Sequence, residues 1–289
     1  MSRFTHFLAV DWSGAAGERH KGIALALAEI GGGPPELLTP PRGGWSRPEA
    51  LGVLADLGSE AALIGVDLGI SLPFADHGAF LPGWAHSPAD ARRLWALIDE
   101  ICADDPHLGA GSFVDHPEIA AYFRRHGGRE GARFGGGRGR LRVTEHAQAR
   151  MGLSPYSNFN LVGAAQVGKS SLTGMRVLNR LADRLAVWPI DPMPGQGAVL
   201  CEIYTSLAAI EAGRSAGRAK MRHMDDLNAA LAVLGAPPAE GSGAIDDHSA
   251  DALLTAAWLR RVHGDAARWQ PQGLTPEIAR TEGWTFGAL

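Results

Sequence analysis

The residues of this sequence best suited to chemistry are acids at the ends of apolar segments. Asp11 follows the apolar residues of HFLAVDWSG, and Asp67 follows those of AALIGVDLG. Asp247 and Asp251 open the last long helical segment, where a spacing of four places both on one face. Acids gathered in one place repel strongly unless divalent cations neutralise them. A fold that brings these four acids together is therefore predicted to bind metal ions.

The chemistry expected of such a site is phosphodiester hydrolysis. Hard oxygen ligands select Mg2+ or Mn2+ rather than zinc. Two such ions about 3.5–4 Å apart activate a water and stabilise the leaving oxygen of a phosphodiester. The acids thus predict a hydrolase, a metal-dependent phosphodiesterase. A structural alternative stays open for the C-terminal acids, in which Asp246 and Asp247 favour the helix N-terminus and Asp251 is solvated.

The segments that carry Asp11 and Asp67 predict how the two acids meet. Three strands in hairpin succession come first and are expected to be antiparallel, over 6–14, 21–30 and 36–39. A helix over 46–57, with Ser46 as its N-cap, then leads to a strand over 61–69. A right-handed crossover places this strand parallel to the first. Both acids then lie at the same end of adjacent strands, where open α/β sheets place their ligands.

The remaining segments complete a single α/β domain over 1–289. Helices are expected over 87–103, with Ser87 as its N-cap, and over 171–185, 221–234 and 246–264. A fifth strand over 198–207 carries Glu202, so the predicted sheet is mixed and five-stranded. Residues 73–160 do not continue the alternation and are interpreted as a large, mostly helical or loop insertion.

Four sequence blocks carry a family resemblance. AVDWSG, LIGVDLGISLPF, VLCEIY and DDHSADALLTAAW together resemble a widespread domain-of-unknown-function family identified as predicted ribonuclease H-like nucleases. The resemblance covers the strand-and-helix core and leaves out 73–160. It implies a ribonuclease H-like fold and a nuclease that acts on nucleic acid with Mg2+ or Mn2+.

The resemblance also implies roles for individual acids. In the superfamily, acids on the first strand, on the strand after the first helix and on the last helix bind the metals. These roles fall on Asp11, Asp67, and Asp251 or Asp247, while Glu202 resembles a family acid on the fifth strand. No acid of the 46–57 helix stands out as a further ligand, which favours a resolvase-like arrangement.

A second motif, GAAQVGKS at Gly163–Ser170, matches the phosphate-loop pattern G-x-x-x-x-G-K-S. In such a loop Lys169 would reach the outer phosphates and Ser170 would bind magnesium. The apolar strand that should precede it is poor, and Pro189 interrupts the strand that should follow. Three interpretations stay open: an NTPase, a loop that caps a helix, or a helix N-terminus that holds a substrate phosphate with Lys169.

Basic and aromatic residues suggest contacts with nucleic acid. Between Arg124 and Arg150 there are eight arginines and two glutamates, interrupted by glycines. This Arg/Gly-rich loop over 124–150 is interpreted as a clamp on phosphates, with a solvated surface loop as the alternative. Trp12, directly after Asp11, could line the cleft or stack on a base. His248 could assist proton transfer, although helical geometry is expected to point it away from Asp247 and Asp251.

Composition excludes several other classes of protein. The 289 residues are 45% hydrophobic and 20% charged, typical of a globular chain. Two cysteines build neither a disulfide framework nor a four-thiolate zinc site. With no long apolar run and no signal peptide, a soluble cytoplasmic protein without membrane contact or disulfide-linked partner is expected. A net charge of −4 argues against indiscriminate nucleic-acid binding. A binding protein of the same fold without turnover remains the alternative to the nuclease.

Overall fold

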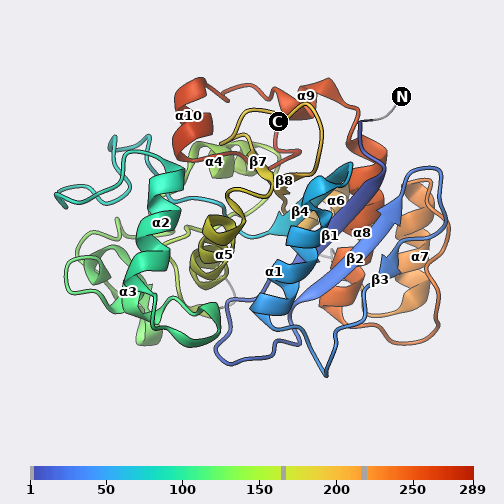
Figure 1. Ribbon diagram of the computed structural model, residues 1–289, viewed down its shortest axis with the longest axis horizontal. Coiled ribbons are helices and arrows are strands. Elements are labelled where there is room, and N and C mark those ends of the chain that lie inside the picture. The colour runs from blue at the N-terminus through green and yellow to red at the C-terminus, as the bar shows by residue number, and fades with distance from the viewer. Residues whose placement is uncertain (1–2, 164–166, 216–219) are drawn as a thin grey trace.

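The computed structural model describes residues 3–163, 167–215 and 220–289. It shows an α/β protein built on a six-stranded mixed sheet with the strand order β3-β2-β1-β4-β8-β7 (Figure 1). The strands of this sheet are β1 (His6–Asp11), β2 (Ala24–Glu29), β3 (Glu36–Leu37), β4 (Ala62–Asp67), β7 (Ala186–Trp188) and β8 (Val199–Glu202). β1, β2 and β3 pair antiparallel, whereas β4 is parallel to β1 and β8, and β7 is parallel to β8.

Helices cover both faces of the sheet. They are α1 (Arg47–Asp56), α2 (Ala91–Ile101), α3 (Gly111–Asp115), α4 (Val143–Arg150), α5 (Val167–Leu181), α6 (Thr205–Glu211), α7 (Met224–Val233), α8 (Asp247–Val262), α9 (Ala266–Trp269) and α10 (Pro276–Thr281). Helices α1, α2 and α5 lie on one side, and α6, α7 and α8 on the other (Figure 1). The sheet is therefore the middle layer of three.

The sheet has one strand more than the five predicted. The additional strand, β7, is only three residues long and stops where Pro189 follows. Three residues are too few for the alternation of apolar and polar side chains to show in a sequence. The strand predicted over 198–207 is also shorter than expected, because β8 ends at Glu202 and α6 begins at Thr205.

Two helix starts illustrate how local sequence determines the elements. Ser46 caps α1 as predicted, since its hydroxyl accepts from Glu49 N at 3.2 Å and the Glu49 carboxylate accepts from Ser46 N at 2.9 Å. The N-cap of α2 is Asp90, not the predicted Ser87, and its carboxylate accepts from Arg93 N at 2.9 Å. The Ser87 hydroxyl instead accepts from Leu81 N at 3.1 Å, within the preceding loop.

Alternating side chains of the strands divide the core into two clusters. In β1, Phe7 and Ala9 pack in the cluster that contains α8, whereas Leu8 and Val10 pack in the cluster that contains α1 and α5. Both clusters are dominated by fully buried aliphatic and aromatic side chains. This alternation determines which face of the sheet each later residue of β1 points to.

Residues 73–160 leave the sheet and fold against α5, on the left of Figure 1. Most of their apolar side chains, such as Trp95 and Phe123, belong to the same hydrophobic cluster as α1 and α5, whereas Ala147 and Leu153 belong to the cluster that contains α8. The glycine-rich part is more regular than expected. It contains a small hairpin of β5 (Arg124–Arg125) and β6 (Arg129–Glu130), and α4 occupies its C-terminal end.

Two further features bear on the sequence expectations. Within the part of the chain that the structure describes, no helix combines the length and the apolar character needed to span a bilayer. Cys102 and Cys201 are both buried as free thiols.

Candidate functional site

Asp11 and Asp67 meet at the carboxyl ends of two neighbouring parallel strands. They are register partners, each the last residue of its strand. Asp11 points to the same face as Ala9, two residues earlier, and that is the face covered by α8. Because partners across a parallel pair share a face, Asp67 points there too. The two carboxyl groups therefore lie side by side under the N-terminal half of α8.

Close packing brings α8 down onto these acids. A Cβ at Gly65, two residues before Asp67, would lie 2.9 Å from Leu259 Cδ1 of α8 and 2.8 Å from Ile203 Cγ2. Glycine at this position leaves room for the Leu259 and Ile203 side chains between helix and strand. On the turn of α8 nearest the acids, His248 Nδ1 lies 3.1 Å from Asp11 Oδ2.

The carboxyl groups of Asp11, Asp67 and Asp251 interact electrostatically. Burial raises the pKa of Asp251 to about 7, and the charge of Asp11 adds to the rise. Burial and the charges of Asp11 and Asp251 raise the pKa of Asp67 well above its usual range. Burial also raises the pKa of Asp11, although His248 partly offsets it. Asp67 and Asp251 are thus harder to ionise because they are buried and lie near other acids.

His248 provides a positive charge close to this group of acids. Its hydrogen bond with Asp11 raises the pKa of the imidazole and so favours the imidazolium. The ring is about half-exposed, at 47% of its side-chain surface, so it reaches solvent as well as Asp11. A spacing of three residues places His248 and Asp251 on one face of α8. The sequence placed His248 only relative to Asp247 and Asp251, and its contact with Asp11 was not predicted.

Asp247 is held by two cations, although its charge also contributes to the raised pKa of Asp251. Its carboxylate pairs with Lys220 Nζ at 2.7 Å and with Arg222 Nε at 3.0 Å. Hydrogen bonds from these two cations lower the pKa of Asp247. Of the two acids that the sequence offered on this helix, Asp251 is therefore the one that the structure brings to Asp11 and Asp67.

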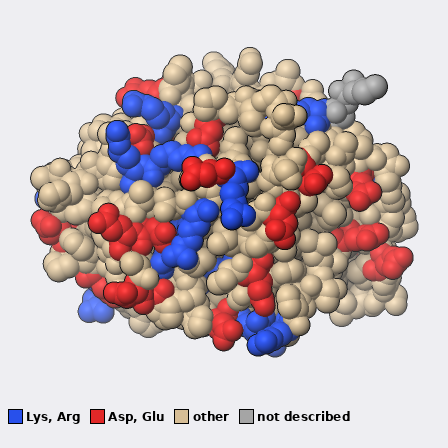
Figure 2. Space-filling model, viewed as in Figure 1, with Lys and Arg blue, Asp and Glu red and all other residues tan. Residues whose placement is uncertain are grey.

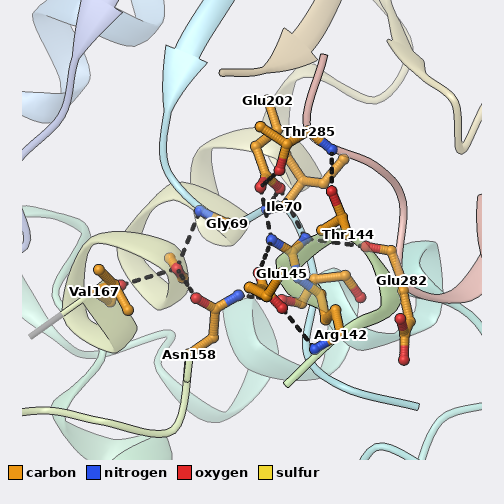
Figure 3. A network of polar contacts seen from close by, with 12 residues as sticks. Gly69, Ile70, Arg142, Thr144, Glu145, Asn158, Val167, Glu202, Glu282 and Thr285 are labelled. Atoms are coloured by element: carbon orange, nitrogen blue, oxygen red, sulfur yellow. Dashed lines mark hydrogen bonds and ion pairs between the residues drawn. The ribbon is translucent and has the colours of Figure 1, made fainter. Parts of the chain in front are cut away.

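Glu202 has a different environment, shown in Figure 3. Arg142 donates to both of its carboxylate oxygens, at 2.6 and 2.8 Å, and Ile70 N and the Thr285 hydroxyl donate as well. Arg142 also donates to Glu145 at 2.5 and 2.9 Å. Arg142, Glu145 and Glu202 are all buried. The Glu202 carboxylate is thus fully used in joining β8 to the 73–160 segment and to the C-terminal residues.

The same network continues into the C-terminal segment. The Glu282 carboxylate accepts from Val143 N and Phe74 N, each at 2.6 Å, and the Glu282 carbonyl accepts from Arg142 at 3.1 Å. Three glutamates and one arginine therefore connect four distant stretches of the chain. Spacing along the sequence gives no sign of this network, because Arg142 and Glu202 are 60 residues apart.

The two phosphate-loop residues face different cavities. Ser170 lines a cavity of about 190 Å3 that Asp67 also lines, while Lys169 lines another of about 350 Å3 with Arg47 and His107. In a phosphate loop the lysine contacts the phosphates and the serine binds their magnesium ion, so both side chains must face the same site. Part of Gly163–Ser170, residues 164–166, lies outside the described residues. Just before it, residue 160 makes only an isolated bridge with Arg124 and does not join the six-stranded sheet.

Two of the eight arginines of the 124–150 loop, Arg140 and Arg142, are buried inside the protein. Arg140 is buried and pairs with Asp76 at 2.6 Å, and Arg142 is enclosed by its glutamates. Arg133 donates to the carbonyl oxygen of Pro82. Figure 2 shows acidic and basic side chains interspersed on one face of the molecule. Burial takes Arg140 and Arg142 out of the predicted phosphate clamp, which stays a prediction for the exposed arginines of the loop.

The donor chemistry of Asp11, Asp67 and Asp251 fits a hard divalent cation, since buried carboxylates without enough positive charge nearby are what such an ion neutralises. Among residues 3–163, 167–215 and 220–289, however, no three histidine, cysteine or acidic side chains already stand at metal-binding distances. A cation would therefore have to draw the carboxylates together as it binds.

Comparisons with known proteins identify no relative. No protein-family model, no curated protein and no solved structure matches this chain. The functional argument accordingly depends on the site itself.

Proposed function

We propose that this protein is a metal-dependent nuclease with a ribonuclease H-like fold. The observation that carries the proposal is the pairing of Asp11 with Asp67 at the carboxyl ends of β1 and β4, with His248 of α8 against Asp11. The antiparallel β3-β2-β1 ribbon joined to parallel β4 and β8 supports the fold that the sequence resemblance implies. In this proposal β7 is an addition at the edge of the five-stranded sheet.

The charges of the site support a bound cation. Burial and neighbouring acids raise the pKa values of Asp67 and Asp251, and the half-exposed His248 contacts Asp11. A dication among these carboxylates would favour their ionised forms and remove the repulsion. Carboxylate ligands favour Mg2+ and Mn2+.

The proposal gives each residue a distinct task. Asp11 and Asp67 would hold the metal, with Asp251 completing the ligand set from α8. Thr205, whose hydroxyl donates to Asp67 Oδ2 at 3.4 Å, would orient that carboxylate. Bound metal would supply an activated water and stabilise the leaving oxygen of a phosphodiester. His248, at 3.1 Å from Asp11 and open to solvent, is placed to hold or release a proton beside the reacting groups.

One observation favours a second candidate, a nucleic-acid-binding protein of this fold without turnover. In the described residues, no three potential ligands stand ready for a metal. If the carboxylates remain protonated or paired with His248 at neutral pH, the fold would bind nucleic acid without cleaving it.

Titration calorimetry with Mn2+ and Mg2+ separates these functions. Wild-type protein should bind Mn2+, and Asp67→Asn should weaken binding by at least about tenfold. Asp247→Asn is the control, because it makes the same substitution at an acid of α8 that pairs with Lys220 and Arg222. Its affinity should equal that of the wild type. Absence of binding by the wild type, or equal losses in both variants, would reject the nuclease proposal.

A further inference from the structure

The cavity beside Asp67 is the feature that the metal site leaves unexplained. It has a volume of about 190 Å3 and lies at the carboxyl ends of β4 and β8. Three aromatic residues, Trp12, Tyr156 and Tyr204, contribute to its wall together with Asp67 and Asn158. We call it the aromatic cavity. An aromatic-walled space next to the reacting groups of an enzyme is a candidate site for part of its substrate.

The aromatic rings are held in place by different means. Trp12 is buried, and its indole N–H donates to Thr173 Oγ1 of α5 at 3.1 Å. A Cβ at Gly14 would lie 2.3 Å from the carbonyl carbon of Lys169, so the chain after β1 runs directly against the first turn of α5. Tyr156, by contrast, is 42% exposed and stands at the rim. The cavity thus has a rigid inner wall and an accessible outer ring.

Charge determines what kind of group can enter. The carboxyl groups of Asp67, Glu145 and Glu202 all line the cavity, against one guanidinium, that of Arg142. Arg142 is already taken up by the two glutamates. A phosphate would be repelled from such a wall, whereas a neutral ring that carries amino groups would not.

The volume of the cavity further limits which group can occupy it. Pockets that enclose whole drug-sized ligands have volumes of about 300–1,000 Å3. The aromatic cavity, at about 190 Å3, is smaller and suits a single ring system. At its rim, the Arg138 guanidinium lies 5.5 Å from the centroid of the Tyr156 ring, which places a cation just outside the cavity. A neutral ring can therefore occupy the inside of the cavity, while a phosphate can bind at the rim.

We propose that the aromatic cavity receives one unpaired nucleobase, so that the substrate of this protein is single-stranded nucleic acid or a strand with an extruded base. This inference rests on the proposed function, because Asp67 belongs to both sites. Bases inside a duplex are stacked and paired and cannot enter such a pocket without being extruded. An unpaired base can stack on Tyr156 while its phosphate passes Arg138 toward Asp67.

The walls also predict how selective the cavity is. The Asn158 amide is already used, since it donates to the Ser71 carbonyl at 2.8 Å and accepts from the Ser171 hydroxyl at 3.2 Å. The Gln148 amide donates to Thr285 Oγ1 at 2.8 Å. With these groups engaged, stacking rather than hydrogen bonding should supply most of the affinity, so preference among the bases should be weak.

Fluorescence anisotropy without added metal tests the cavity independently of catalysis. The probes are labelled DNA and RNA oligonucleotides of about twelve nucleotides, each as a single strand and as a blunt duplex. Wild-type protein should bind a single strand at least about tenfold more tightly than its duplex. Tyr156→Ala should lower single-strand affinity about tenfold, as expected for one lost stacking partner, and Tyr156→Phe should remain within about twofold of the wild type. Because Tyr156 is exposed, both variants should fold, and thermal melting verifies this.

A second probe locates the base. 2-Aminopurine placed at successive positions of the single strand should change its fluorescence strongly at one position, and Tyr156→Ala should abolish that change. Equal affinity for single strand and duplex, no binding of either, or unchanged binding by Tyr156→Ala would overturn the inference. Mn2+-dependent cleavage that does not depend on Tyr156 would support the proposed function and contradict the base-binding inference. Tyr156-dependent binding of a single strand by a protein that does not bind Mn2+ would support the base-binding inference and contradict the proposed function.

Discussion

Two groups of buried carboxylates lie on neighbouring strands and are neutralised in opposite ways. Around Glu202, Arg142 joins two glutamates through hydrogen bonds of 2.5–2.9 Å, and all three side chains are buried. Around Asp67, burial and neighbouring acids raise the pKa values of Asp67 and Asp251, and the positive groups that act on these acids are the half-exposed His248 and Lys220. Both groups contain acids that the sequence marked as candidates. We propose that the first group stabilises the fold, whereas the second is arranged for a ligand.

Removing the cation of the first group should have the largest effect on stability. Arg142→Met would leave Glu145 and Glu202 buried without their partner, at a cost of about 3–5 kcal/mol in the free energy of unfolding. Urea denaturation at neutral pH measures this loss. Arg150→Met, on the exposed C-terminal end of α4, is the control and should stay within about 0.5 kcal/mol of the wild type. A similar small loss for both variants would mean that the network does not support the fold.

Removing an acid of the second group should have the opposite effect and increase the stability of the protein. Without metal, Asp67→Asn should stabilise the protein by about 1 kcal/mol at neutral pH, because it removes an acid that burial and its neighbours make costly to ionise. Excess Mn2+, at about a hundred times its Kd, should stabilise the wild type by about 2.7 kcal/mol and leave the variant unchanged. Urea midpoints with and without Mn2+ give both quantities. A destabilised variant that still responds to Mn2+ would contradict the comparison.

The pH dependence follows from the raised pKa values. An acid whose pKa is higher in the folded than in the unfolded state contributes stability that is lost as pH rises between the two values. For Asp251 this interval runs from the usual 3.8 to about 7. The raised pKa values of Asp11 and His248 act in the same direction. Metal-free protein should therefore be less stable at pH 8 than at pH 5.5.

Denaturation at both pH values checks this expectation, and Asp251→Asn should reduce the difference. Saturating Mn2+ should reverse it, since a cation favours the ionised carboxylates. Equal stability at the two pH values, in the wild type and in the variant, would show that the three acids do not interact.

The smallest effect is expected at Asp247. Its partners Lys220 and Arg222 are exposed, and pairs of this kind contribute at most about 1 kcal/mol. Asp247→Asn should therefore change the urea midpoint only slightly and leave the response to Mn2+ intact. Loss of that response would place Asp247 among the ligands and remove the distinction drawn between the two helix acids.

Much of the sheet could be predicted because its signals are local. The apolar runs that end at Asp11 and Asp67, and the helix between them, predict two adjacent parallel strands, and the structure shows this pairing. The sequence also predicted Ser46 as the N-cap of α1, and the structure confirms it. Strand β7 and the Asp90 cap were missed, because three residues carry no clear period and two capping residues stood close together.

The surroundings of the acids could not be predicted in the same way. Asp247 and Asp251 share a helix face in the sequence, and only the approach of α8 over Gly65 brings Asp251 and His248 to β1 and β4. The partner of Glu202 is 60 residues away, in a glycine-rich segment that was interpreted as a mobile loop. Pairing between buried charges that are far apart in the sequence leaves no periodic signal. The sequence patterns therefore identified the acids but did not predict Arg142 and His248 as their partners.

A crystal structure determined with Mn2+ tests the central claim most directly. The account predicts anomalous density between the carboxyl groups of Asp11 and Asp67, with Asp251 turned toward it and Arg142 still bound to Glu202. No density beside Asp11 at saturating Mn2+, or an ion coordinated by Glu145 and Glu202 instead, would contradict it.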